Sequence, residues 1–311
     1  MRRVFIDTDM GFDDLVAILM VARAPEIEIA GLSLVAGNAP LETVAANARA
    51  ARAFFSWTMP IHPGAARPVA GDLVTAAYVL GETGMASAGR ILPPAGGPLD
   101  AAHALDALVR YLEEAPGEIL ALGPLTNIAH LAMIRPDLAS RIERLVWMGG
   151  SAGPGNHTAS AEFNAFVDPE AIAAVLGAGV RLQMVGLDAC RPVTVSMEDV
   201  AAMRAADPGE RGATLADLLE AYVRIALPSG GKAQAIFDPV AAAALIAPQT
   251  VAFRPARLDV ELAGRHTRGM TVVEWRVPRK APANADIAVS PDAPRIRALI
   301  LDALRSSLAI S

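Results

Sequence analysis

Four carboxylates crowd the first predicted turn of the chain. The eight residues that follow a short apolar run contain all of them: Asp7, Asp9, Asp13 and Asp14. At an effective dielectric constant of about 20, two negative charges about 5 Å apart repel by roughly 3 kcal/mol. Such a cluster is tolerated if the side chains diverge, if some are protonated, or if a cation lies among them. Because every candidate ligand is an oxygen, the cluster favours a hard cation, Ca²⁺ or Mg²⁺.

Other interpretations compete for the same segment. Asp13 and Asp14 are suited to cap the next helix, but capping does not explain Asp7 and Asp9 at the end of a strand. An EF-hand loop is excluded, because a helix must precede it and a Glu must occupy its twelfth position. A phosphatase of the haloacid-dehalogenase type, with Asp7 as nucleophile, also begins with a strand and Asp-x-Asp. That class expects Thr or Val where this chain has Gly11.

An alternation of strand and helix patterns positions this segment. Apolar runs predict buried strands, and helical spacing predicts the helices between them. The predicted strands span 4–7, 27–35, 118–122, 144–148 and 181–187, and the predicted helices span 13–24, 40–55, 125–134 and 169–176. This order predicts an α/β fold with a mostly parallel central sheet and helices on both faces. Ligands bind beyond the carboxyl ends of such strands, where Asp7, Asn38, Gly123, Gly149 and Asp188 stand.

The remaining chain breaks this rhythm. A stretch rich in Gly, Ala and Pro over 66–98 predicts a long surface excursion, and the mostly helical stretch 197–227 is a candidate lid. A helix follows Pro239. Later patterns predict additional strands near the C-terminus, which we expect to pair antiparallel, and a closing helix: 251–262, 271–276, 287–289 and 294–308. We find neither an internal repeat nor a low-complexity linker, so we expect one domain over 1–311.

Composition narrows the class of protein. The chain has 311 residues, 53% of them apolar and 5% aromatic, which suits Ala-rich helices packed on Val and Ile strands. Net charge is −6 without a basic block, so we expect no nucleic-acid partner. No apolar run is long enough for a bilayer, and residues 1–6 lack the pattern of a signal peptide. With Cys190 as the single cysteine, we expect a cytoplasmic protein without an intrachain disulfide.

The acidic segment resembles the Asp-x-Asp-Pro-Gly-x-Asp-Asp signature of the inosine–uridine-type nucleoside hydrolases, with Met10 in place of the usual Pro. Further blocks match that family in its order along most of the chain: Gly37-Asn38, Gly123-Pro124-Leu125-Thr126-Asn127, Trp147-Met148-Gly149-Gly150, Asn156, Ala161-Glu162-Phe163-Asn164, Asp168-Pro169-Glu170 and Asp238-Pro239. The resemblance implies the Rossmann-like fold of that family and hydrolysis of the bond between ribose and a nucleobase in a small ribonucleoside. It also implies a homo-oligomer, a dimer or a tetramer.

The same resemblance implies roles for individual residues. Ca²⁺ would be held by Asp9, Asp14, Asp238 and the main-chain carbonyl of Leu122, with Asp7 supporting that site. Asp9 would accept a proton from the attacking water. The ribose would be bound by Asp13, Asn38, Met148, Asn156, Glu162 and Asn164. These types suit the task, because a buried sugar hydroxyl needs a paired donor or acceptor.

Simpler interpretations stand beside these roles. Asn38 and Asn156 also fit plain turn formers, and Glu162 fits a solvated loop charge. Asp238 before Pro239 is a suitable helix N-cap, which is compatible with metal ligation.

The chain differs from the family pattern at the residues that are expected to activate the departing base. Many relatives place a His directly before the late Asp, where this chain has Phe237, and Leu80 replaces a second expected His. Phe237 cannot donate a proton, but it could stack on a base with Tyr78, which favours purines; packing in the core is its alternative. His157, beside Asn156, is a candidate substitute acid or a surface residue. The missing His leaves a non-catalytic nucleoside or ribose binder as an alternative function, beside the phosphatase.

Overall fold

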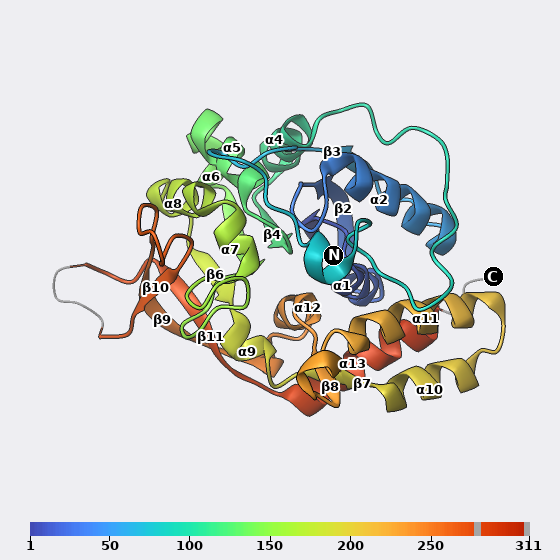
Figure 1. Ribbon diagram of the computed structural model, residues 1–311. Coiled ribbons are helices and arrows are strands. Elements are labelled where there is room, and N and C mark those ends of the chain that lie inside the picture. Colours follow the sequence, from blue (N-terminus) through green and yellow to red (C-terminus); the bar gives the residue numbers. More distant parts are fainter. Residues whose placement is uncertain (277–280, 308–311) are drawn as a thin grey trace.

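A single twisted sheet organises the chain. The computed structural model describes residues 1–276 and 281–307 (Figure 1). Within them, nine strands form one sheet in the order β10-β9-β11-β6-β5-β4-β1-β2-β3. Their bounds are β1 (Arg2–Thr8), β2 (Ile27–Leu34), β3 (Ile61–Pro63), β4 (Gly117–Ala121), β5 (Ile142–Met148), β6 (Leu182–Val185), β9 (Val251–Val260), β10 (Thr271–Glu274) and β11 (Ala285–Pro291). A separate two-stranded ribbon pairs β7 (Thr194–Ser196) with β8 (Ala233–Ala235).

The central strands are buried on both faces, because successive side chains point to opposite sides of the sheet. On β1, Val4 and Ile6 enter one hydrophobic cluster and Phe5 enters the other. On β5, Val146 joins the first cluster and Trp147 the second. One hydrophobic core therefore lies on each face of the sheet, as the continuous apolar runs predict.

Helices cover each core (Figure 1). The first core packs against α1 (Phe12–Ala22), α2 (Leu41–Phe55), α10 (Met197–Ala206), α11 (Glu210–Arg224), α12 (Asp238–Ile246) and α13 (Ala293–Ser306). The second packs against α4 (Ala104–Glu114), α5 (Thr126–Ile134), α6 (Pro136–Ala139) and α8 (Pro169–Gly177). Short elements lie beyond the ends of the strands: α3 (Ala77–Leu80), α7 (Phe163–Val167), α9 (Leu187–Cys190), η1 (Leu227–Ser229) and η2 (Pro248–Thr250).

Strands β1 to β6 and β11 run parallel, so the ends of β1, β2, β4 and β5 meet at one edge. The predicted α/β fold with extra antiparallel strands is confirmed. One detail of the C-terminal strands differs: β11 pairs antiparallel with β9 but parallel with β6. It therefore joins the parallel sheet and carries β9 and β10 as an antiparallel extension.

Element boundaries deviate from the prediction by a few residues at most ends. The surface excursion 66–98 is largely irregular, with only α3 inside it, and 197–227 holds α10 and α11. The predicted closing helix ends at Ser306 as α13, and position 308 lies outside the described residues. The strand predictions do not include β3, β7 or β8, which are three residues long each and carry no alternation. In the described ranges, no helix is long and apolar enough to cross a membrane.

Candidate functional site

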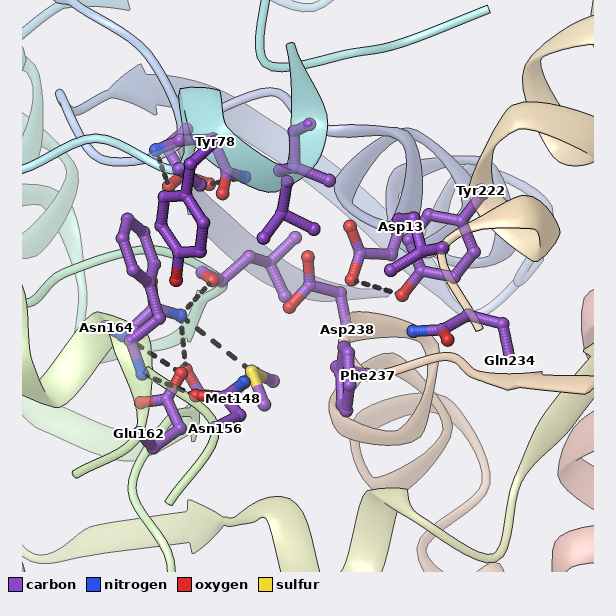
Figure 2. A pocket seen from close by; sticks show the side chains of 18 residues that line it. Asp13, Tyr78, Met148, Asn156, Glu162, Asn164, Tyr222, Gln234, Phe237 and Asp238 are labelled. Carbon is purple, nitrogen blue, oxygen red and sulfur yellow. Dashed lines mark hydrogen bonds between the residues drawn. The ribbon is translucent and has the colours of Figure 1, made fainter. Parts of the chain in front are cut away.

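A cavity of about 270 Å³ opens beyond the ends of β1, β4 and β5 (Figure 2). Ten of the eleven residues predicted for the site line it: Asp9, Asp13, Asn38, Leu122, Met148, Asn156, Glu162, Asn164, Phe237 and Asp238. The eleventh, Asp14, is fully buried behind Asp13 and Asp238. The structure thus brings together residues that lie more than two hundred positions apart, from β1 to the start of α12.

Carboxylates gather at the floor of this cavity. One ligand atom from each of Asp13, Asp14 and Asp238 lies within 4.8 Å of the other two. The Asp9 carboxyl also lies beside that of Asp14. All four side chains are buried, with Asp9 1% exposed and Asp14 fully enclosed. These converging carboxylate oxygens could hold a divalent cation.

Asp14 also caps helix α1, so the capping interpretation is correct for this residue. The Thr8 hydroxyl donates to Asp14 Oδ1 at 2.5 Å, and the Gly11 main-chain N–H donates to Oδ2 at 2.8 Å. These hydrogen bonds to the Asp14 carboxylate hold the turn between β1 and α1 in place. Because a carboxylate has about four lone-pair sites, capping leaves room for a further partner.

Asp9 is held in place by Asn38. The main-chain N–H of Asn38 donates to Asp9 Oδ2 at 2.7 Å, and its side-chain Nδ2 donates to Oδ1 at 3.0 Å. This close approach needs a glycine at position 37, because a Cβ there would lie 2.2 Å from Asp9 Oδ2. Asn38 is therefore more than a turn former: it orients the carboxylate that we expect to act as base.

Asp7 faces away from the cavity. Its Oδ1 accepts from the Ser33 hydroxyl and, at 2.7 Å, from Asn127 Nδ2, while Oδ2 has no partner in the described structure. Asn127 also bonds Leu34 and Ala65, which explains the Thr-Asn pair after β4. Because Asp7 is fully buried and does not line the cavity, it has no access to a substrate phosphate. The phosphatase interpretation is therefore wrong.

Burial raises the pKa of every carboxyl in the cluster. The pKa of Asp13 rises to about 7, first through burial and then through repulsion by Asp14. The pKa values of Asp9 and Asp238 rise well above the ordinary range for the same two reasons. None of the described residues that line the cavity is Lys, Arg or His. An all-oxygen donor set without a cationic side chain fits a hard divalent ion, whose charge would lower these pKa values.

Amides and a glutamate form the wall beside the acidic floor. Asn164 Nδ2 donates to the carbonyls of Leu122 at 2.9 Å and Met148 at 3.1 Å, so its Oδ1 stays available as an acceptor. Asn156 Oδ1 accepts from the Phe163 main-chain N–H at 3.0 Å, which leaves its Nδ2 as a donor. The wall therefore presents both donors and acceptors to a polyhydroxylated ligand.

Glu162 is a buried helix cap rather than a solvated loop charge. Its two oxygens accept from the main-chain N–H groups of Gly150, Asn164 and Ala165 at 2.8 to 3.0 Å. Burial raises its pKa to about 6, although these bonds oppose the rise. The carboxylate is fixed at the start of α7 and faces the cavity.

Apolar side chains form the opposite part of the cavity. Phe237 and Leu80, which occupy the two positions where the family commonly has His, both line it, together with Val79 and Ile225. His157 does not line the cavity; its Nδ1 lies 3.0 Å from the hydroxyl of Tyr78, which does. His157 can reach a ligand only through Tyr78.

Two polar cavity residues escaped the sequence analysis, Tyr222 on α11 and Gln234 on β8. The Tyr222 hydroxyl lies 3.1 Å from Asp13 Oδ2 and 3.2 Å from the Ala235 carbonyl, and the ring packs against Phe12 at 5.5 Å between centroids. Neither residue belongs to a recognisable motif. A Tyr at a helical core spacing is indistinguishable from ordinary packing until the fold places α11 on α1.

Met10 adopts an unusual backbone conformation at the centre of the acidic turn. Its φ is +51°, in the left-handed region, and its main-chain N–H donates to Thr8 Oγ1 at 3.1 Å. Proline is locked near −65° and has no N–H. A proline, the usual residue of the motif, could therefore not adopt the backbone conformation that the turn has at position 10.

Comparisons with known proteins agree with this geometry. Residues 4–298 match the sequence profile described as "Inosine-uridine preferring nucleoside hydrolase". The non-specific ribonucleoside hydrolase RihC of Salmonella agona is 37% identical over 291 residues, which cover 93% of each chain. The pyrimidine-specific ribonucleoside hydrolase RihA of Shewanella woodyi is 35% identical over 312 residues, covering 99% of this chain and 98% of that protein. The solved structure of the plant nucleoside hydrolase PpNRh1 superposes with a TM-score of 0.89 at 25% identity, covering 98% and 99% of the two chains.

Proposed function

The chain belongs to the family of inosine-uridine preferring nucleoside hydrolases, which split ribonucleosides at the N-glycosidic bond, and we propose that it does so with Asp9 as the base that activates water. One observation carries this proposal. Asp13 and Asp14 from the first turn meet Asp238 from α12 with their ligand atoms within 4.8 Å, at the floor of a cavity. Capping of α1 accounts for Asp14 alone, whereas a bound cation accounts for the burial of all three like charges.

We propose that Asp9, Asp14, Asp238 and the Leu122 carbonyl hold Ca²⁺. The Leu122 carbonyl already accepts from Asn164 and has a second lone pair to offer. Asp13, whose ligand atom lies within the same cluster, is placed to accept a sugar hydroxyl beside the ion. When bound, the ion supplies Lewis-acid chemistry: it orients the ribose diol and the attacking water and makes that water more acidic.

The side chains of the cavity perform the remaining steps. Two hydrogen bonds from Asn38 hold the Asp9 carboxylate toward the floor, and they leave it lone pairs with which to accept a proton. Asn156, Glu162 and Asn164 pair the sugar hydroxyls. The transition state resembles an oxocarbenium ion, as in glycoside hydrolysis, and the buried carboxylates stabilise its positive charge.

The apolar end of the cavity receives the base. Phe237, Leu80, Val79 and Ile225 exclude water there, and Phe237 and Tyr78 offer aromatic faces. We propose a preference for purines, because a two-ring base covers more of this surface. The named relatives differ in preference, one non-specific and one pyrimidine-specific, so both base classes belong in the test.

The deciding experiment is a reducing-sugar assay with inosine, adenosine, uridine and cytidine, with and without a chelator. We expect ribose release that the chelator abolishes and Ca²⁺ restores. Asp9→Asn should lower kcat by about 10²- to 10⁴-fold with an unchanged circular dichroism spectrum. Asp72→Asn, at an exposed position that does not line the cavity, serves as the matched control. Tight nucleoside binding without released ribose would instead identify a binder, and a fully active Asp9→Asn enzyme would refute the role of Asp9.

A further inference from the structure

The residues named so far do not explain how the departing base is stabilised. Cleavage leaves the electron pair of the N-glycosidic bond on the base, and a stabilising hydrogen bond lowers the barrier to its departure. At both positions where relatives commonly carry His, this chain has apolar side chains, Leu80 and Phe237. Stacking on Phe237 alone gives no hydrogen bond to a charged base.

The hydroxyl groups near that end already have partners. Tyr222 has one hydroxyl proton, and Asp13 Oδ2 and the Ala235 carbonyl, at 3.1 and 3.2 Å, both compete for it. The Tyr78 hydroxyl pairs with His157 Nδ1 at 3.0 Å, and Tyr78 is 67% exposed. Tyr222 would have to give up an existing bond to serve the base, and so would Tyr78 in the tautomer in which its hydroxyl donates to His157.

Gln234 is differently placed. It lines the cavity from β8, on the same side as Tyr222 and Phe237 and opposite Asn164 and Glu162 (Figure 2). Across the described part of the chain, its side-chain amide has no hydrogen-bond partner. It is thus an uncommitted polar side chain in the lining of the cavity, as Phe237 and Ile225 are apolar ones.

The backbone beneath Gln234 is held firmly. Strand β8 pairs with β7, with Gln234 opposite Val195, and the next carbonyl, that of Ala235, lies within reach of the Tyr222 hydroxyl. Val195 and Ile236 are fully buried and anchor the ribbon in the first core. Because side chains alternate along a strand, this pairing fixes which face of β8 the amide occupies. A donor on such a support loses less entropy on binding a ligand than one on a loose loop.

We propose that Gln234 donates an amide N–H to the leaving nucleobase, stabilising the charge that develops on it, in an inference that rests on the proposed function. Water adds its oxygen to C1′ and gives its proton to Asp9, the C1′–N bond breaks, and the base departs with the electron pair. The amide keeps its proton throughout. The base anion then takes a proton from a second water, and the hydroxide left behind takes the proton held by Asp9, which restores the carboxylate. Gln234 is therefore a hydrogen-bond donor in the transition state and not a general acid.

The same donor can serve purines, for which we propose the preference, and also pyrimidines. In purines an unprotonated ring nitrogen, and in pyrimidines a carbonyl oxygen, is bonded to the carbon that adjoins the glycosidic nitrogen. A single amide N–H can serve either acceptor, and rotation of the amide presents its oxygen instead to a donor. The expected ligand class is thus a nucleobase with an acceptor beside the scissile bond.

The test compares two kinds of leaving group. Gln234→Leu keeps the size of the side chain but removes the donor, and Gln234→Glu replaces the amide by a carboxylate that cannot donate when ionised. We expect both variants to lower kcat/KM for nucleosides by about 10- to 100-fold, the loss typical of one hydrogen bond to a charged group. 4-Nitrophenyl β-D-ribofuranoside releases a stabilised phenolate that needs no such bond. Its hydrolysis should change by less than about 3-fold.

Gln249→Leu is the matched control, because Gln249 is exposed in η2 and does not line the cavity. Equal losses on nucleosides and on the aryl riboside would overturn the proposal, since they would indicate general damage to the site. Unchanged nucleoside hydrolysis by both Gln234 variants would overturn it as well. If the unaltered enzyme released no ribose from any nucleoside, the proposed function would fail first, which the same assay distinguishes.

Discussion

Calcium should stabilise this protein more at about pH 8 than at about pH 5.5, because the buried carboxyls must lose protons before they bind a cation. Asp13 has a ligand atom within 4.8 Å of those of Asp14 and Asp238, so a cation held by them favours its ionised form. Its folded-state pKa is about 7 against an ordinary value of 3.8. Its raised pKa makes the metal-free fold most stable below pH 3.8, and that stability is lost as the pH rises through about 7. The metal-free fold is thus less stable at alkaline pH, and a bound cation offsets this loss of stability.

The magnitude follows from that pKa. Between about pH 5.5 and a folded-state pKa of about 7, displacing one proton costs about 2 kcal/mol of apparent binding free energy. At about 2.1 cal/mol/K per residue, unfolding the 311 residues carries an entropy of about 0.65 kcal/mol/K. The rise in Tm on adding calcium should therefore be about 3 °C larger at the higher pH. Further carboxyls of the cluster would enlarge the difference, although coupled sites do not add simply.

The assay is differential scanning fluorimetry of chelator-treated protein, with and without saturating calcium, at both pH values. Taking the difference at each pH cancels the titration of groups remote from the site. Asp13→Asn should shrink the pH-dependent part of the shift. Asp72→Asn, at an exposed position that does not line the cavity, should leave it unchanged. A calcium shift that is equal at the two pH values, or larger at the acidic one, would refute this reasoning.

Two further substitutions test contacts around the acidic turn. Tyr222→Phe keeps the packing on Phe12 but removes the hydrogen bond to Asp13. We therefore expect kcat/KM for ribonucleosides to fall by about 10-fold with little change in Tm. An unchanged kcat/KM would show that the hydrogen bond is dispensable. Met10→Pro restores the common residue of the motif, yet it should destabilise the fold by about 2–3 kcal/mol, because proline cannot adopt a φ of +51° and loses the N–H bond to Thr8. Urea unfolding measures this loss, and a stabilised variant would contradict it.

The sequence alone predicted the repeated strands and helices of the first half. Each depends on a local pattern: apolar runs as in β4 and β5, and helical spacing as in α5. The acidic turn and the Gly37-Asn38 pair were recognisable because their chemistry is contained in a few adjacent residues. The short strands β7 and β8 were not predicted, since three residues carry too little periodicity.

Only the tertiary structure showed how distant residues come to share the cavity, although the family resemblance implied that Asp238 joins Asp9 and Asp14. Asp238 meets Asp13 and Asp14 only because α12 packs against α1, and the separation along the chain carries no distance information. Packing of α11 against α1 and of β8 against α11 brings Tyr222 and Gln234 to the cavity, and pairing of β1 with β2 places Asp7 beside Ser33. A local pattern specifies the type of a side chain and its face, whereas the neighbours of that face are set by contacts between elements.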